Sequence, residues 1–121
     1  MKMKTQTVLQ KRVKEWLLKC FGVKIANNLP ERNHRFLGEA LELVQPAGCA
    51  KEEALLLVDY VFSRPKGEQY QEVGGVMVTL SALCSCLELD YYKCFEIELN
   101  RIERPEIIEK IRQKQLTKPL S

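Results

Sequence analysis

The sequence predicts an all-α fold in a single domain. Apolar residues recur at helical spacing in successive segments, and Pro and Gly fall between those segments. The length of 121 residues suits one modest core rather than several. With 45% hydrophobic and 29% charged residues, the composition is that of a globular protein and excludes a disordered or low-complexity chain. We therefore expect a helical bundle of four to five helices in one domain spanning residues 1–121.

The N-terminal segment, residues 5–21, predicts an amphipathic helix. Val8, Val13, Trp16 and Leu17 recur at helical spacing, and basic residues lie largely on the other side. Gly22 is expected to end this helix. A basic amphipathic helix can lie on a membrane or on a nucleic acid backbone, but a helix packed in a globular domain with a solvated basic face is the favoured reading. Residues 1–28 thus form the expected N-terminal helix and turn.

Two further helices are predicted in the central part of the chain. Pro30 stands near the first helical position and Glu31 in the first turn, where the helix dipole favours an acid, so a helix is expected over residues 31–45. Pro46 and Gly48 end it. The next helix is expected over 51–62, with several of its apolar residues on a buried side.

The next predicted helix, residues 68–87, contains an unusual uncharged run. All fifteen residues from 73 to 87 lack charge, so no face of this helix is suited to water. The β-branched residues in the run are also compatible with a strand, but its length and apolar spacing favour a helix. Fifteen residues are too few to cross a bilayer. We therefore expect this helix to be covered on all sides, partly by other copies of the chain in a homodimer or tetramer.

The C-terminal part predicts further helical structure and a short tail. Asp90 is the expected N-cap of a helix over 91–104, and Pro105 begins another helical segment with a basic end. Residues 117–121 are expected to fray.

The acidic pair Glu39 and Glu42 is the first candidate for chemistry. Residues three apart share a helix face, and this pair flanks the apolar sector of the helix. Two carboxylates on a rigid helix beside apolar surface suit a hard cation such as Mg²⁺. The alternative is that both are ordinary solvated helix acids.

A second acidic position, Glu72, opens the uncharged run downstream. The two stretches together resemble the MazG-like nucleoside triphosphate pyrophosphohydrolase superfamily, whose pattern is E-x-x-E followed by E-x-x-D. The resemblance is close from Arg32 to Leu83, looser from Trp16 to Pro119, and points to a phage and bacterial branch. It rests on the segments ERNHRFLGEALELVQ, LVDYVFSRP, EVGGVMVTLSALC and EKIRQKQ.

The resemblance implies a MazG-like helical bundle, which uses Mg²⁺ as cofactor to hydrolyse a nucleoside triphosphate substrate to the monophosphate and pyrophosphate. It implies Glu39, Glu42 and Glu72 as the catalytic and metal-binding acids. Basic residues near the C-terminus are candidates for phosphate contacts: Arg101, Lys110, Arg112 and Lys114. The chain departs from the pattern at Gly75, where the fourth acid would stand, and Glu68 or Asp59 is the candidate to supplement the metal ligands.

The net charge and the cysteine content limit the expected binding partners and the expected cellular compartment. The net charge of +3 is mild, so nucleic acid is not expected as a partner, and no membrane association is expected. Five cysteines without a secretory signal predict reduced thiols in a cytoplasmic protein. Two alternatives to the enzyme remain open: a catalytically weakened MazG-like module that binds nucleotide or a protein, and a helical nucleic-acid accessory protein that uses its basic arms.

Overall fold

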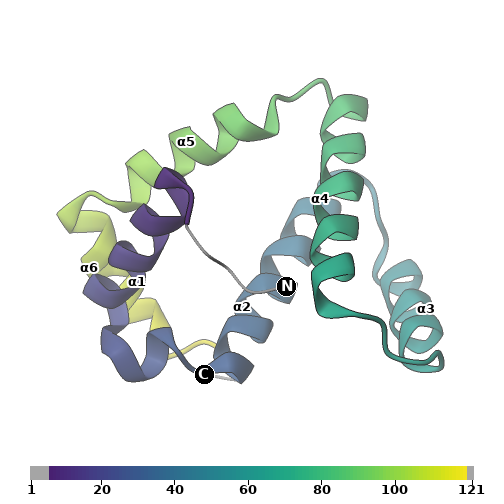
Figure 1. The fold of residues 1–121 in the computed structure, drawn as a ribbon, viewed down its shortest axis with the longest axis horizontal. Coiled ribbons are helices and arrows are strands. Elements are labelled where there is room, and N and C mark those ends of the chain that lie inside the picture. Colours follow the sequence, from purple (N-terminus) through teal and green to yellow (C-terminus); the bar gives the residue numbers. More distant parts are fainter. Residues whose placement is uncertain (1–5, 120–121) are drawn as a thin grey trace.

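The computed structural model describes residues 6–119, which form six helices and no strand (Figure 1). The helices are α1 (Val8–Ala26), α2 (Leu29–Val44), α3 (Lys51–Phe62), α4 (Gln69–Cys86), α5 (Tyr91–Ile102) and α6 (Pro105–Gln115). The predicted all-α class is confirmed. The described residues hold six helices rather than the expected four to five, and the sixth is the helical segment that was expected to begin at Pro105.

Side-chain caps set the starts of three helices. The Asp90 carboxylate accepts a hydrogen bond from the Lys93 backbone N–H at 3.0 Å, which confirms its predicted role as N-cap. Asn28 caps α2 in the same way, and Thr7 caps α1. The first helix therefore begins at Val8, and the part of the predicted helix at residue 5 lies outside the described residues, as do residues 120 and 121 of the expected frayed tail.

Gly22 breaks α1 but does not end it. Its φ of 79° lies in the left-handed region that favours glycine, and the helix resumes beyond it to Ala26. Such a break deprives carbonyls in the preceding turn of their usual partners. The Arg112 guanidinium of α6 donates hydrogen bonds to the carbonyls of Lys19 and Cys20, just before the break. The kink in α1 is thus held by α6.

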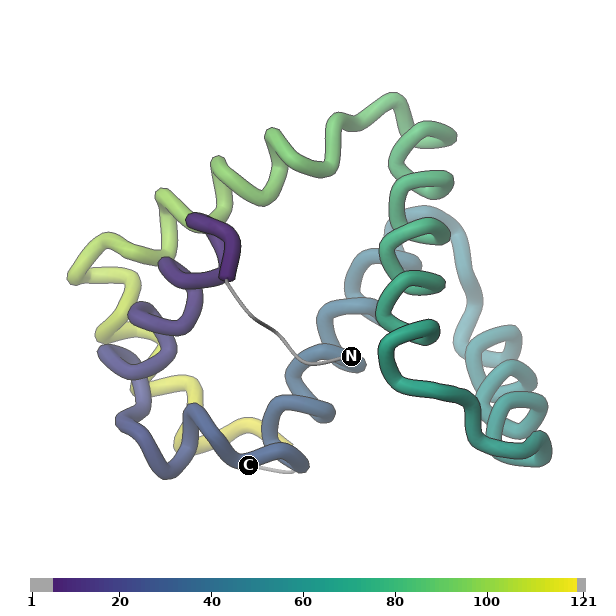
Figure 2. The backbone as a smooth tube through the Cα atoms, in the orientation of Figure 1, coloured from purple at the N-terminus to yellow at the C-terminus, as the bar shows by residue number. Residues whose placement is uncertain are grey.

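The small core lies where α1, α5 and α6 meet. Leu99 of α5 is only 1% exposed, and Leu9, Cys20 and Ile108 are also buried. The Trp16 indole of α1 donates a hydrogen bond to the Ile102 carbonyl at 2.8 Å. Figure 2 shows α1, α5 and α6 gathered on one side of the molecule, with α3 at the opposite extreme.

The other half of the chain is poorly covered by its own helices. Every residue of α3 except Ala54 is exposed, and Phe62 is 86% exposed. In α4, residues 69–79 are all exposed, and Val78 reaches 69%. The uncharged helix is therefore not covered on all sides within one chain, because α4 packs mainly on α5, near its C-terminal end.

The total exposed area of the chain is also larger than that of a compact protein of the same mass. A compact protein of 14.0 kDa exposes roughly 6,700 Å², whereas this chain exposes 10239 Å². Many large apolar side chains are among the exposed ones, and their exposure costs free energy in water.

Among the described residues, no single helix is both long and apolar enough to cross a membrane. Helices α4 and α5 satisfy length and composition only as a pair, and they are bent by 99° relative to each other.

Candidate metal site

Glu39 and Glu42 lie on the second half of α2, one turn apart and both exposed. Neither side chain makes a hydrogen bond or ion pair in the part of the chain that the structure describes. Their oxygens are therefore available to a ligand. Two free carboxylates on one helix face can supply two ligands to a hard cation.

The other three acids lie on different elements. Glu72 occupies the first turn of α4, Glu68 is its N-cap residue without a capping hydrogen bond, and Asp59 lies on α3. All three are exposed. The Glu72 side chain folds back toward Gly67 at the entry to α4.

These five acids do not form a metal site within one chain. Over residues 6–119, no group of three or more His, Cys, Asp or Glu side chains lies in an arrangement that could hold a metal ion. The expected convergence of Glu39, Glu42 and Glu72 across neighbouring helices is therefore absent from the single chain. The physical reason is that α2 and α4 do not pack substantially against each other, so their acids stay apart.

An apolar groove adjoins Glu42. It has a volume of about 610 Å³ and runs between the end of α2 and the start of α3. Glu42 and Lys51 are its charged residues, and its apolar wall comes from both helices: Leu41, Val44, Ala54, Leu55 and Val58. The volume falls in the range of small-molecule and cofactor pockets. Sequence reasoning found both apolar helix faces but did not pair them into one groove.

The candidate phosphate contacts lie at the other side of the molecule, on α5 and α6. Arg101 pairs with Glu98, at 2.8 Å between Nη2 and Oε2, and Arg112 holds the kink in α1. Lys110 and Lys114 are exposed, and their side chains make no hydrogen bond or ion pair within residues 6–119. The two arginines thus have structural partners, and only the two lysines point freely to solvent.

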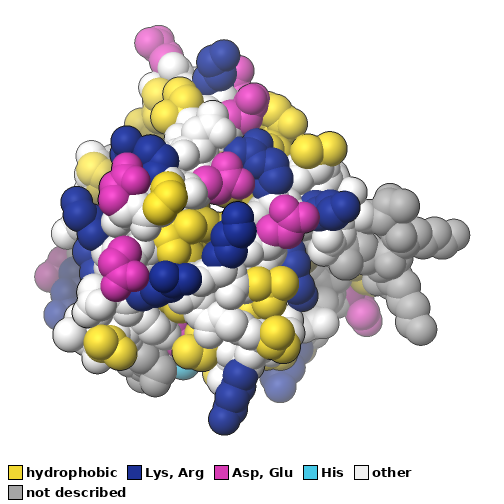
Figure 3. Space-filling model, turned by 90° about the vertical axis from the view of Figure 1, so that its left-hand side faces the viewer, with side chains coloured by type: hydrophobic (Ala, Val, Ile, Leu, Met, Phe, Trp, Pro, Cys, Tyr) yellow, Lys and Arg dark blue, Asp and Glu magenta, His cyan; other side chains and the backbone are white. Residues whose placement is uncertain are grey.

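The same side carries a mixture of charges and no basic stripe. Figure 3 shows Lys and Arg interspersed with Asp and Glu and with scattered apolar side chains. A nucleic-acid surface needs clustered positive charge. This face does not resemble one.

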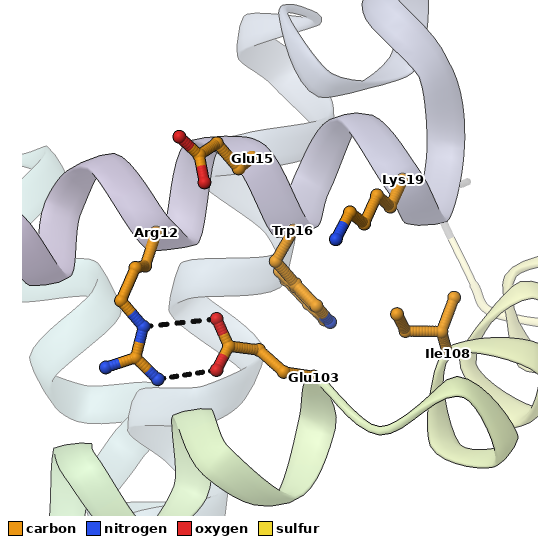
Figure 4. Close-up of a pocket in the computed structure, with 6 residues that line it drawn as sticks. All are labelled: Arg12, Glu15, Trp16, Lys19, Glu103 and Ile108. Carbon is orange, nitrogen blue, oxygen red and sulfur yellow. Dashed lines mark hydrogen bonds and ion pairs between the residues drawn. The ribbon is translucent and has the colours of Figure 1, made fainter.

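A small pocket between α1 and α5–α6 is bridged by an ion pair that acts as a structural clamp (Figure 4). Its volume is about 80 Å³, far below that of a nucleotide site. Arg12 reaches across it and binds both oxygens of Glu103, with 3.2 Å between Nε and Oε2. The hydrogen bond from Arg12 lowers the pKa of the Glu103 carboxyl.

This clamp predicts a loss of stability in acid. Because the pKa of Glu103 is lower in the folded chain, its contribution is present above the ordinary Glu pKa of about 4.3 and is lost as the pH falls through the folded value. We expect Glu103→Gln to lower the Tm by a few degrees at pH 7 and much less at about pH 3. Thermal melts of both proteins from pH 7 to 3 measure this, and a Tm difference that does not shrink in acid would contradict it.

A buried ionic cluster ties the start of α2 to α6. Glu31 is 5% exposed and lies 3.1 Å from Arg35 Nε and 3.5 Å from Arg32 Nη2. Gln115 donates a hydrogen bond to it at 3.0 Å. Neither arginine is aligned for a hydrogen bond to Glu31, so their contact is mainly electrostatic. The sequence marked Glu31 only as a first-turn acid, since its burial depends on α6, which lies far along the chain.

The fold and site define an open helical chain with an unpaired acid pair beside an apolar groove. Comparison with known proteins found no match to a protein-family model, to a curated protein or to a solved structure.

Proposed function

We propose that the protein is a Mg²⁺-dependent nucleoside triphosphate pyrophosphohydrolase that releases the nucleoside monophosphate and pyrophosphate. The observation that carries the proposal is the pair Glu39 and Glu42, one turn apart on α2 and without a partner among residues 6–119, with Glu42 on the wall of an apolar groove. The resemblance of residues 32–83 to the MazG-like pattern supplies the reaction.

The donor set suits Mg²⁺. Carboxylate oxygens are its preferred protein ligands, and it commonly uses only one or two carboxylates together with water and substrate phosphate oxygens. Glu39 and Glu42 would hold it, with Glu72 as a third acid and Glu68 or Asp59 as supplements. When bound, the cation offsets the negative charge of the triphosphate and of the leaving pyrophosphate.

The remaining chemistry falls to the chain itself. One carboxylate that is not bound to the cation can orient the attacking water and accept its proton. The apolar surface beside Glu42 limits the access of water to the carboxylates and to the bound triphosphate. Lys110 and Lys114 lie on α6, away from this groove, and are not needed for this arrangement.

The second candidate is a catalytically weakened module that binds nucleotide or a protein without turnover. Gly75, at the place of the fourth motif acid, favours it because glycine offers no ligand. Binding of nucleotide without product release would identify this function. A salt-dependent shift of DNA or RNA would instead favour the nucleic-acid accessory protein.

The test is a pyrophosphate-release screen with canonical and modified nucleoside triphosphates, each with Mg²⁺ and with excess EDTA. We expect at least one substrate to give equal amounts of monophosphate and pyrophosphate, with the reaction abolished by EDTA and restored by added Mg²⁺. If no triphosphate in the panel is cleaved, the hydrolase proposal fails.

A further inference from the structure

Two apolar surfaces of this chain are left uncovered: a groove and a helix segment. One is the α2–α3 groove, whose charged residues are Glu42 and Lys51 only. The other is the α4 segment, residues 69–79, in which every residue is exposed and none is charged from Val73 onward. A water-exposed helix normally carries a charged or polar face, whereas this segment has no charged residue from Val73 onward.

The chain does not bring its own α4 into the groove. The groove is lined only by α2, α3 and the connection between them. Helix α3 packs on no other described helix to any substantial extent. Since an isolated helix of 12 residues is marginal in water, α3 needs a packing partner that the described chain does not provide.

The exposed area supports a partner of considerable size. The chain exposes roughly 3,500 Å² more than a compact protein of its mass, whereas a standard interface buries about 800 Å² on each partner. Obligate homodimers reach the larger values, and their interfaces resemble a domain core cut in two. A second copy of this chain carries both the groove and the helix to fill it.

We propose that residues 69–79 of α4 from one copy lie in the α2–α3 groove of a second copy, and that the exchange is reciprocal about a two-fold axis. One contact then covers the groove, including the face of α3 that lines it, and the face of α4 that enters it. Gly74 and Gly75 have open space around them in the single chain, so this part of α4 can lie close to the groove wall.

The arrangement also deepens the proposed function, on which this step rests. Glu72 is the residue directly before the docked uncharged run, and Glu42 stands on the groove wall. Docking therefore carries Glu72 of one copy toward Glu39 and Glu42 of the other. The acid set that a single chain leaves apart is completed between two copies.

Sedimentation velocity on a matched pair of variants tests the association without reference to activity. Val78→Asp places a charge on the docked segment, and Val23→Asp places one on α1 at similar exposure, 69% against 67%. We expect the wild type and Val23→Asp to sediment as oligomers at micromolar concentration, and Val78→Asp to be at least about ten times weaker in association. A wild-type monomer of 14.0 kDa, or an oligomer indifferent to Val78→Asp, overturns the proposal.

Cross-linking provides a second measurement that holds even if Val78→Asp unfolds. Cys49 has a free thiol on the groove, whereas Cys20 is buried and its burial raises the pKa of the thiol. With Cys86→Ser and Cys94→Ser removing other exposed thiols, Met77→Cys treated with a short bismaleimide should give a covalent dimer. The dimer should disappear when Cys49→Ser is added.

A cross-linked dimer that persists with Cys49→Ser would overturn the groove as the docking site. The absence of any covalent dimer would overturn it as well. Binding of the monomer to anionic lipid vesicles, with burial of α4 there, would assign the apolar face to a membrane instead of a second copy.

Discussion

Glu42→Gln and Glu72→Gln are each expected to lower the rate of pyrophosphate release by more than about 100-fold. Loss of a residue that merely orients a metal ligand costs about 10- to 100-fold, so loss of a ligand should cost at least as much. Glutamine keeps the size of the side chain and removes its charge. Both variants should also lose the rise in Tm that Mg²⁺ gives the wild-type protein, because a ligand that binds only the folded state stabilises it.

Glu52→Gln is the matched control for these variants. Glu52 is an exposed acid in the first turn of α3 and belongs to none of the proposed ligand sets. It should leave both the rate and the Mg²⁺-dependent Tm unchanged. Wild-type rates together with wild-type Mg²⁺ stabilisation in Glu42→Gln and Glu72→Gln would show that these carboxylates are not ligands.

Glu31→Ala is expected to lower the free energy of unfolding by about 3 kcal/mol. Glu31 is buried, and its removal would leave Arg32 and Arg35 as half-buried cations without their counter-ion. The Gln115 amide that donates to it would lose its acceptor as well. Urea unfolding followed by circular dichroism measures the change.

Glu109→Ala is the control for Glu31→Ala, because it removes an exposed acid instead of a buried one. Glu109 is exposed and pairs with Arg112 one turn away, at 3.4 Å. Its replacement should change the free energy of unfolding by no more than about 0.5 kcal/mol. Equal effects of the two substitutions would contradict the assignment of Glu31 as the centre of a buried cluster.

Local signals in the sequence predicted most of the helix boundaries. Asp90 as an N-cap and Pro105 at a helix start each act on backbone groups within one turn, so their effects can be read without knowledge of the tertiary fold. Gly22 was expected to end the first helix, but α1 continues beyond it to Ala26. The backbone conformation of Gly22 kinks the helix, and Arg112, 90 residues further on, donates hydrogen bonds to the carbonyls before the break.

The site was less predictable because it depends on contacts between distant segments. The spacing of Glu39 and Glu42 on one helix face is a local property, and it was predicted. The placement of Glu72 relative to them depends on how α4 packs, and within one chain α4 packs mainly on α5. The uncharged run of α4 indicated that part of this helix is covered by another copy of the chain. That statement stays a prediction.

Mixing two inactive variants tests most directly the claim that two copies share the acid set. Glu42→Gln and Glu72→Gln, unfolded together and refolded as an equal mixture, should form mixed dimers in which one of the two sites keeps all its acids. Random pairing in a two-fold dimer predicts recovery of about a quarter of the wild-type rate. If each variant alone is inactive, the wild type is active after the same treatment and the mixture stays inactive, the site lies within one copy and the account is contradicted.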